Sequence, residues 1–241
     1  MKISAKPGLT SRDISLAYDE FFKQKGLLRD SDTYYRWVLS KISFRPGQRV
    51  LDVACGEGLL VKFAREQGLI AVGIDLSLQG TILAREFVND TIITQANGEE
   101  LPFASESFDI VTNLGSLEHF QDAETGLKEM IRVLRPGGQA VTVLPNSYYL
   151  VDILWEVWRT GYGVSHKQPL ERFASFGEWR EFIQRSGLRV IKAYKYNFCF
   201  PRSSADWAWY RQHPRKLLNL LVSPFIPFNL SNHFLYVCSR D

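Results

Sequence analysis

Strand-like and helix-like runs alternate along the middle of this 241-residue chain, starting near residue 48. The strand-like runs are rich in Val and Ile and read RVLDVA, IAVGID, TIITQAN, FDIVTNLG and QAVTVLP. Helical runs lie between them, and the last of these, TGLKEMIRVL, stops at the breaker RPGG. This alternation predicts a parallel sheet with helices on both faces. Ligands of such sheets bind beyond the carboxyl ends of the strands, where the strand order reverses.

The flanking segments predict further helices and two more strands. Residues 14–42 read as helical, and residues 148–184 read as helical with a loop at TGYGVSHKQPL. LRVIKAYKYNF is typical of a sixth strand and HFLYVCSR of a seventh, with an aromatic, Pro-containing insert between them. A chain of this length can bury one substantial core, so we expect a single domain.

The segment VLDVACGEG, residues 50–58, joins the first strand to the first helix of this region. A dinucleotide loop needs G-x-G-x-x-G, but Val61 stands at the third glycine position. A phosphate loop needs GK[ST], which is absent as well. The segment carries Asp52 and Glu57 and no Lys or Arg, so it would repel a pyrophosphate and tolerate a positively charged ligand.

Five segments in a fixed order resemble the class I S-adenosylmethionine-dependent methyltransferases, in particular the small-molecule group that includes quinone-biosynthesis enzymes. They are VLDVACGEG, GIDLS, QANGEELPFASESFDIV, NLGSLEHF and MIRVLRPGG, within about residues 48–145. The resemblance implies an α/β, Rossmann-like, doubly wound sheet of seven strands, mostly parallel with an antiparallel last strand. It also implies an N-terminal helical cap (1–45), a cofactor-binding core (46–147) and a substrate-side part (148–241).

The resemblance implies a role for each residue of the cofactor site. Asp75 would bind both ribose hydroxyls, although a strand-end Asp can also be only a helix cap. Asp52 would accept from the ammonium or brace the loop. Asn97 would accept from the adenine amine in place of the usual Asp, or serve only as a turn residue. The further cofactor residues are Ala54, Gly56, Gly58, Leu76, Gly98, Asn113 and Tyr18. Ala54 replaces a frequent glycine at little cost. Tyr18 lies near Phe21 in a segment that closes over the cofactor in relatives.

Methyl transfer needs a general base only if the acceptor must lose a proton. His119 is the first candidate, because it follows the fourth strand on the acceptor side, and its neighbour Glu118 is the second. His166, in the loop GVSHKQP, is a third candidate. His119 could instead brace its helix. No metal site is expected, because the three cysteines show no metal-binding spacing.

The C-terminal part of the chain differs in charge from the rest. Residues 1–149 carry 16 Lys and Arg against 19 Asp and Glu, whereas residues 150–241 carry 13 against 7, a net charge of +6. The second part also holds 18 of the 32 aromatic residues. These residues favour a substrate lid and core cap for a bulky, partly apolar acceptor over peripheral membrane contact, because Pro224 and Pro227 break any long amphipathic helix there.

Together these features predict methyl transfer from S-adenosylmethionine to O, N or C of a small molecule, with S-adenosylhomocysteine as product. Two alternatives stay open, a non-catalytic S-adenosylmethionine-binding protein and an NAD-dependent oxidoreductase, the second disfavoured by the missing third glycine. A nucleic-acid partner is not expected, because the fourth strand ends in NLGS rather than a DPPY-like segment. The chain shows neither an apolar signal peptide nor a disulfide framework, so we expect a cytoplasmic protein. The sequence leaves the oligomeric state open.

Overall fold

A computed structural model describes residues 2–5, 10–25, 30–88, 92–163 and 169–241. Its centre is a seven-stranded sheet in the order β4-β3-β2-β5-β6-β9-β8. Only β9 runs antiparallel to its neighbours in this sheet, so the doubly wound, mostly parallel arrangement is confirmed. The strands are β2 (Arg49–Val53), β3 (Ile70–Asp75), β4 (Ile93–Gln95), β5 (Phe108–Leu114), β6 (Leu134–Pro145), β8 (Arg189–Tyr196) and β9 (His233–Ser239).

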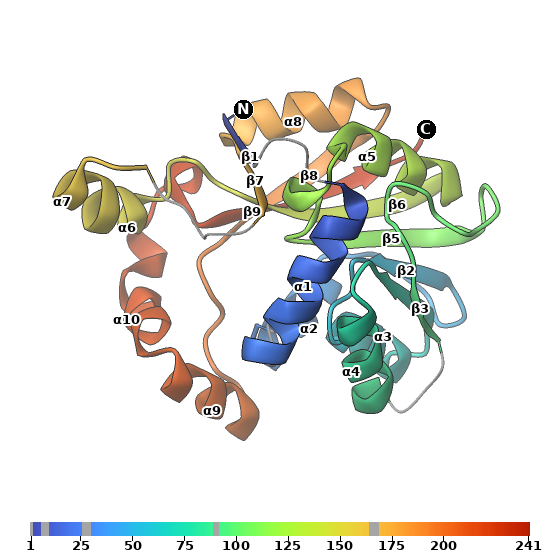
Figure 1. Cartoon of the computed structure of the whole chain (residues 1–241), viewed down its shortest axis with the longest axis horizontal. Helices are drawn as coiled ribbons and strands as arrows, with labels where there is room; N and C mark the ends of the chain where they lie inside the picture. The colour runs from blue at the N-terminus through green and yellow to red at the C-terminus, as the bar shows by residue number, and fades with distance from the viewer. Residues whose placement is uncertain (1, 6–9, 26–29, 89–91, 164–168) are drawn as a thin grey trace.

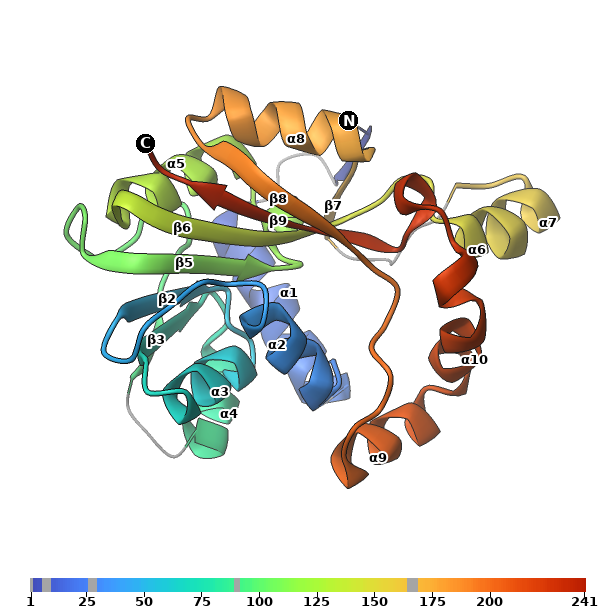
Figure 2. The same cartoon turned by 180° about the vertical axis from the view of Figure 1, so that it is seen from behind.

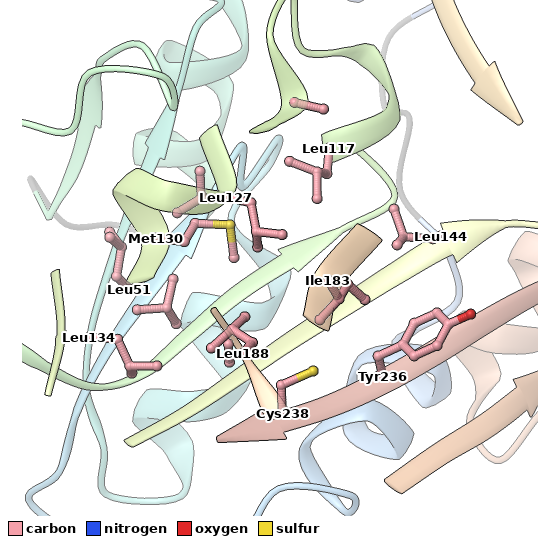
Figure 3. Close-up of a cluster of buried hydrophobic side chains, with 14 of the residues drawn as sticks. Leu51, Leu117, Leu127, Met130, Leu134, Leu144, Ile183, Leu188, Tyr236 and Cys238 are labelled. Atoms are coloured by element: carbon pink, nitrogen blue, oxygen red, sulfur yellow. The ribbon is translucent and has the colours of Figure 1, made fainter. Parts of the chain in front are cut away.

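Helices cover both faces of the sheet, as the views in Figures 1 and 2 show. One face packs on α5 (Ala123–Val133) and α8 (Phe176–Arg185), and the other packs on α2 (Asp32–Leu39) and α3 (Leu59–Glu66). The strands supply both cores because successive side chains point to opposite faces. In β9, Phe234, Tyr236 and Cys238 enter the first core, and Leu235 and Val237 enter the second. Figure 3 shows the first core, where Tyr236 and Cys238 lie near Ile183 of α8.

Local sequence explains where two of these helices begin. The Asp122 carboxylate accepts hydrogen bonds from the backbone N–H groups of Glu124 and Thr125, which start α5. Ser175 and Glu178 form a reciprocal capping box at the start of α8. Both caps satisfy N–H groups that a helix terminus would otherwise leave without partners, so each helix has a defined first turn.

A second, two-stranded sheet was not expected from the sequence. It pairs β1 (Lys2–Ala5) with β7 (Leu170–Phe173) in antiparallel register. The expectation that residues 148–184 are helical outside their loop is therefore wrong at residues 171–173, which form β7 together with Leu170. Four residues are too few to show a periodicity, and their pairing partner lies at the far end of the sequence.

Helix α1 (Ser11–Lys25) lies across the carboxyl ends of the strands and contacts α4 (Leu78–Val88). Its Ser15 hydroxyl donates to the Leu76 carbonyl at 2.9 Å. Its Asp19 carboxylate accepts from the Ser77 hydroxyl at 2.5 Å and from the Gln79 N–H at 3.0 Å. These bonds hold α1 on the turn that follows β3, beside the point between β2 and β5 where the strand order reverses.

The segment before β9 forms α9 (Ser204–Gln212) and α10 (Pro214–Val222), which lie off the edge of the sheet with α6 (Leu150–Asp152) and α7 (Trp158–Thr160) (Figures 1 and 2). A π-helical turn, Ile153–Val157, joins α6 to α7. Helix α10 ends before Pro224, as the prolines predict. Asp206 ties α9 to α2, because its carboxylate accepts from the backbone N–H and the hydroxyl of Thr33. Among the described residues, no helix is long and apolar enough to cross a membrane.

Candidate functional site

A cavity of about 370 Å³ lies at the carboxyl ends of β2, β3 and β5, beneath α1. Its volume falls within the usual range for small-molecule sites. Most of the residues that the sequence assigns to the cofactor lie in its wall, although they come from four separate segments. They are Tyr18, Asp52, Ala54, Gly56, Asp75, Leu76, Asn97 and Gly98, and the acceptor-side candidate His119 lines the cavity as well.

The glycine loop turns sharply after β2, and three of its residues adopt the left-handed conformation. Their φ angles are +58° at Ala54, +51° at Gly56 and +73° at Gly58. Glycine adopts this conformation without strain, whereas a residue with a Cβ atom pays roughly 1–2 kcal/mol. Ala54 is therefore a costlier replacement of glycine than its small size suggests.

Asp75 connects the end of β3 to the glycine loop. Its Oδ2 accepts from the Gly56 N–H and its Oδ1 from the Ser77 N–H, both at 2.9 Å. The carboxylate thus braces the turn, as in the helix-cap alternative, yet it also lines the cavity. A carboxylate oxygen has a second lone pair, so both oxygens can still accept from a ligand hydroxyl. Burial raises the pKa of Asp75, and its two N–H donors oppose that rise.

Asp52 lies at the base of the cavity and is 4% exposed. The Thr112 hydroxyl of β5 donates to its Oδ1 at 2.6 Å. Burial is the main reason that the pKa of Asp52 rises to about 7, and the nearby charge of Asp75 adds to the effect. A cation bound beside Asp52 would replace the lost solvation and favour the ionised carboxylate.

The side of the cavity near Asn97 is narrow and partly aromatic. Asn97 Oδ1 accepts from the Glu99 N–H at 3.0 Å, which is the turn role left open by the sequence, and its side chain also lines the cavity. A Cβ atom at Gly98 would come within 2.5 Å of Cζ of Phe120. Phe120 and Glu99 line this side too, and sequence reasoning missed both. The one signal available in the sequence was the aromatic residue at the end of NLGSLEHF, which is Phe120 itself.

Two assigned residues, Gly58 and Asn113, do not line the cavity. Asn113 is fully buried, and its Nδ2 donates to the Val53 carbonyl at 3.0 Å. Its Oδ1 accepts from the Leu117 N–H at 2.8 Å, so the side chain links the end of β2 to the 3₁₀ helix Leu117–His119. Gly58 begins α3 and packs against Val88. Both residues shape the floor behind the cavity wall.

The cavity wall is acidic. Its described residues include the carboxylates of Asp52, Glu57, Asp75 and Glu99 and contain neither Lys nor Arg. Tyr18 of α1 lines the cavity, and burial raises the pKa of its hydroxyl strongly, with Glu118, Asp75 and Glu171 contributing. This wall suits a ligand with positive charge and hydroxyl donors and disfavours a phosphate. Among the described residues, no group of three His, Cys, Asp or Glu could hold a metal ion.

The two described acceptor-side candidates point in different directions. His119 lines the main cavity, and its ring meets Tyr18 edge-on with centroids 6.4 Å apart. Its Nδ1 lies 2.6 Å from the Leu170 carbonyl of β7, so this nitrogen carries the proton in that bond. Glu118 is buried and lines a smaller cavity behind His119. His166 lies outside the described residues.

The sheet order and the cavity at the strand ends define a Rossmann-like fold of the methyltransferase type. Residues 51–142 match the family described as "Methyltransferase domain". The resemblance inferred from the five sequence segments is confirmed over this region.

Individual relatives agree with this assignment. The ubiquinone/menaquinone biosynthesis C-methyltransferase UbiE of Stenotrophomonas maltophilia is 36% identical over 120 residues, covering 44% of this chain and 45% of that protein. The chain thus matches its curated relatives over only about half of their length.

Solved structures extend the similarity to the fold as a whole. The Haemonchus contortus phosphoethanolamine N-methyltransferase 2, in complex with S-adenosyl-L-methionine, has a TM-score of 0.62 at 20% identity, covering 98% of this chain and 58% of that one. The [4+2]-cyclase SpnF has a TM-score of 0.68 at 16% identity, covering 98% of this chain and 99% of that one. At such identities the likeness shows the fold alone. The two proteins are named for different reactions, an N-methyl transfer and a [4+2] cyclisation.

Proposed function

We propose that this protein transfers a methyl group from S-adenosylmethionine to O, N or C of a small molecule, leaving S-adenosylhomocysteine. One observation carries the proposal: the cavity at the switch point has four carboxylates and no Lys or Arg in its described wall. A sulfonium nucleoside with an ammonium group suits this wall, whereas the pyrophosphate of NAD does not. The methyltransferase domain at residues 51–142 supports the same assignment.

Different residues of this chain bind different parts of the cofactor. Asp75 accepts from the ribose hydroxyls while it holds the glycine loop through Gly56. Asp52 would face the ammonium group, and Leu76, Phe120 and Asn97 would hold the adenine. When bound, S-adenosylmethionine supplies a methyl group already activated by its sulfonium. We assign residues 46–147 to cofactor binding, residues 1–45 to a helical cap and residues 148–241 to the remainder of one domain.

On the acceptor side the protein orients the reactants and excludes water, which can supply much of the acceleration in such a displacement. Tyr18 closes the cavity next to His119. Because the Nδ1 proton of His119 is held by the Leu170 carbonyl, Nε2 is the atom that can accept a proton. An acceptor that must lose a proton on attack gives it to this Nε2 atom.

The proposal is tested by calorimetry with S-adenosylmethionine and by transfer of a labelled methyl group to a panel of phenols, amines and enolisable carbonyls. We expect binding, transfer to one class, and a fall in turnover of about 100-fold in His119→Ala with little change in cofactor affinity. Binding without transfer to any acceptor would favour the non-catalytic alternative. Unchanged turnover in the variant would remove His119 as the base, and binding of NAD instead would overturn the assignment.

The C-terminal aromatic segment makes a different contribution from the expected lid. Trp209, Tyr210 and Leu220 form a small buried cluster, which fits the cap role. None of the described residues in 148–163 or 200–230 lines either cavity. Large apolar side chains of this segment are instead exposed, among them Trp158 at 83% and Phe225 at 84%.

Basic residues accompany this apolar surface. The Arg159 and Arg215 guanidinium groups lie 5.4 and 6.0 Å from the Trp155 ring centroid, so α7 and α10 present cations and aromatic rings together. This combination supports peripheral contact with an anionic membrane surface. The three free thiols, Cys55, Cys199 and Cys238, support a reducing compartment such as the cytoplasm.

A further inference from the structure

A second cavity, of about 120 Å³, lies on the other side of His119 from the main one. Gly115 and His119 line both, so the two spaces adjoin. The walls of the second cavity come from elements far apart in the sequence. Its described lining is Gly115, Glu118, His119, Pro145, Glu171, Arg172, Phe173 and His233.

Glu118 distinguishes this cavity from an ordinary packing defect. The residue is 4% exposed, and its Oε2 atom has no hydrogen-bond partner. Its other oxygen, Oε1, lies 3.8 Å from His119 Nε2. A buried carboxyl oxygen without a partner is costly, so its presence beside a cavity points to a ligand that supplies the missing partner.

The charged neighbours decide what kind of donor fits. Glu171 of β7 adds a second carboxylate to the wall. Arg172 also lines the cavity, but its guanidinium donates to the carbonyls of Glu118, Phe120 and Gln121. The Arg172 charge interacts favourably with Glu99 and Asp122, on the side of the main cavity and of α5. The second cavity therefore has two carboxyl groups, and its one guanidinium is committed to backbone oxygens.

The ring nitrogens of His119 and His233 complete the polar lining. His119 holds its Nδ1 proton on the Leu170 carbonyl, and its Nε2 lies on the side of Glu118, 3.8 Å from Oε1. Tyr18, on α1, lines the main cavity and feels the charges of both Glu118 and Glu171. Carboxyl and imidazole groups around a small cavity can bind a cationic N–H donor.

We propose that the second cavity binds a protonated alkylamine group of the methyl acceptor, with Glu118 as its principal partner. This inference rests on the proposed function, because the amine would anchor an acceptor whose reacting atom reaches the main cavity past His119. The role differs from that of a general base: Glu118 selects the acceptor by charge and stays bound to it. The cavity has room for a small alkylammonium group.

Proton release provides a readout of this binding. Burial raises the pKa of Glu118 to about 8, so the carboxyl group is mostly protonated at pH 7 before the ligand binds. An ammonium group favours the ionised form, and its binding must expel the proton. A neutral ligand would leave that proton in place. The facing groups that could respond as well are His119, Glu171, Arg172, His233 and Tyr18.

The test compares n-propylammonium with n-propanol, which differ in charge at nearly equal size. Each is titrated at pH 7 into the full-length protein, with and without saturating S-adenosylhomocysteine, in two buffers of different ionisation enthalpy. We expect the ammonium ion to bind at least tenfold more tightly and to release about one proton. Glu118→Gln should remove both the preference and the release. Glu124→Gln changes an exposed carboxylate of α5 that is paired with Lys128 and should keep both.

Equal binding of the amine and the alcohol to the wild-type protein would overturn the proposal, and so would an unchanged preference in Glu118→Gln. Binding of S-adenosylhomocysteine without the amine would reject the amine site and leave the proposed function intact. If the protein binds the amine but does not bind S-adenosylhomocysteine, the amine site is kept and the proposed function is rejected. If Glu118→Gln does not fold, the wild-type comparison and its proton count decide the question alone.

Discussion

The backbone N–H of Gly56 donates a hydrogen bond of 2.9 Å to Oδ2 of Asp75, nineteen residues later in the chain. This bond joins the loop after β2 to the end of β3, two strands that pair in parallel. A single carboxylate therefore shapes the loop and faces the cavity. Cofactor affinity and loop geometry should depend on Asp75 together.

Replacing Asp75 with Asn should lower S-adenosylmethionine affinity by about 100-fold or more. The reason is that hydrogen bonds from ribose hydroxyls to a carboxylate are charge-assisted, at about 1.5–3 kcal/mol each, and the amide nitrogen cannot accept. Calorimetry measures the change, with Glu181→Gln, on the exposed side of α8, as control. Near-normal affinity in the Asp75 variant would remove this residue from the cofactor site.

Replacing Asp52 with Asn should change how stability depends on pH. Burial holds the pKa of Asp52 at about 7, above its ordinary value of 3.8, so between these values the folded state binds more protons than the unfolded state. The free energy of unfolding therefore falls as pH rises from about 4 to 7 because of this group, by up to about 4 kcal/mol. The amide of the Asp52→Asn variant does not titrate, and its oxygen can still accept from the Thr112 hydroxyl.

The difference in unfolding free energy between Asp52→Asn and the wild type should thus grow in favour of the variant from pH 4 to pH 7 and stay level above pH 8. Urea denaturation across this range measures it. A difference that is constant with pH would mean that Asp52 is not buried in its neutral form. Saturating S-adenosylmethionine should reduce the difference, because the bound cation stabilises the ionised carboxylate.

Ala54→Gly should raise the free energy of unfolding by about 1 kcal/mol. Ala54 adopts a φ of +58°, where its Cβ atom is strained and glycine is not. Ala64→Gly is the matched control, because Ala64 lies inside α3 and glycine should lower stability there. Chemical denaturation of both variants measures the contrast. A loss of stability in both would show that the strain at Ala54 is negligible.

Two glycine-to-alanine substitutions should have different effects. A Cβ atom at Gly98 would lie 2.5 Å from the Phe120 ring and 3.0 Å from Val53, so Gly98→Ala should displace Phe120 and weaken cofactor binding at least tenfold. At Gly177, in the first turn of α8, an added Cβ atom would meet nothing within 4 Å beyond its chain neighbours and the backbone of its own helix, so Gly177→Ala should be neutral or stabilising. Binding and melting measurements on both variants compare the two sites, and equal effects would contradict the assignment of the Phe120 side.

Trp158→Ala combined with Phe225→Ala should weaken binding to phosphatidylglycerol vesicles about tenfold or more. Both side chains are more than four-fifths exposed, Trp158 in α7 and Phe225 in the turn after α10, and Arg159 and Arg215 of these two helices add positive charge. Vesicle sedimentation measures the effect, and Ile70→Ala, at 54% exposure on β3, is the control. Equal binding of the wild type to phosphatidylcholine and phosphatidylglycerol would contradict a contribution from the basic residues.

Much of the cofactor side of the cavity was predictable because its residues lie at strand ends within short sequence segments. Asp75 directly ends a strand, and a strand end of a parallel sheet faces the ligand edge. Asn113 occupies the same kind of position, yet its side chain is hydrogen-bonded to the backbone of Val53 and Leu117. Sequence position places a residue near the edge, but the direction of a side chain depends on neighbours from other segments.

The sequence by itself determined the seven-stranded α/β fold and the acidic character of the glycine loop, because periodicity and charge are local properties of the chain. Only the tertiary structure decided the pairing of β1 with β7, the burial of Glu118 and its second cavity, and the placement of the aromatic C-terminal segment away from both cavities. Each of these depends on contacts between residues far apart in sequence, and the free energy of such contacts has no signature in either segment alone.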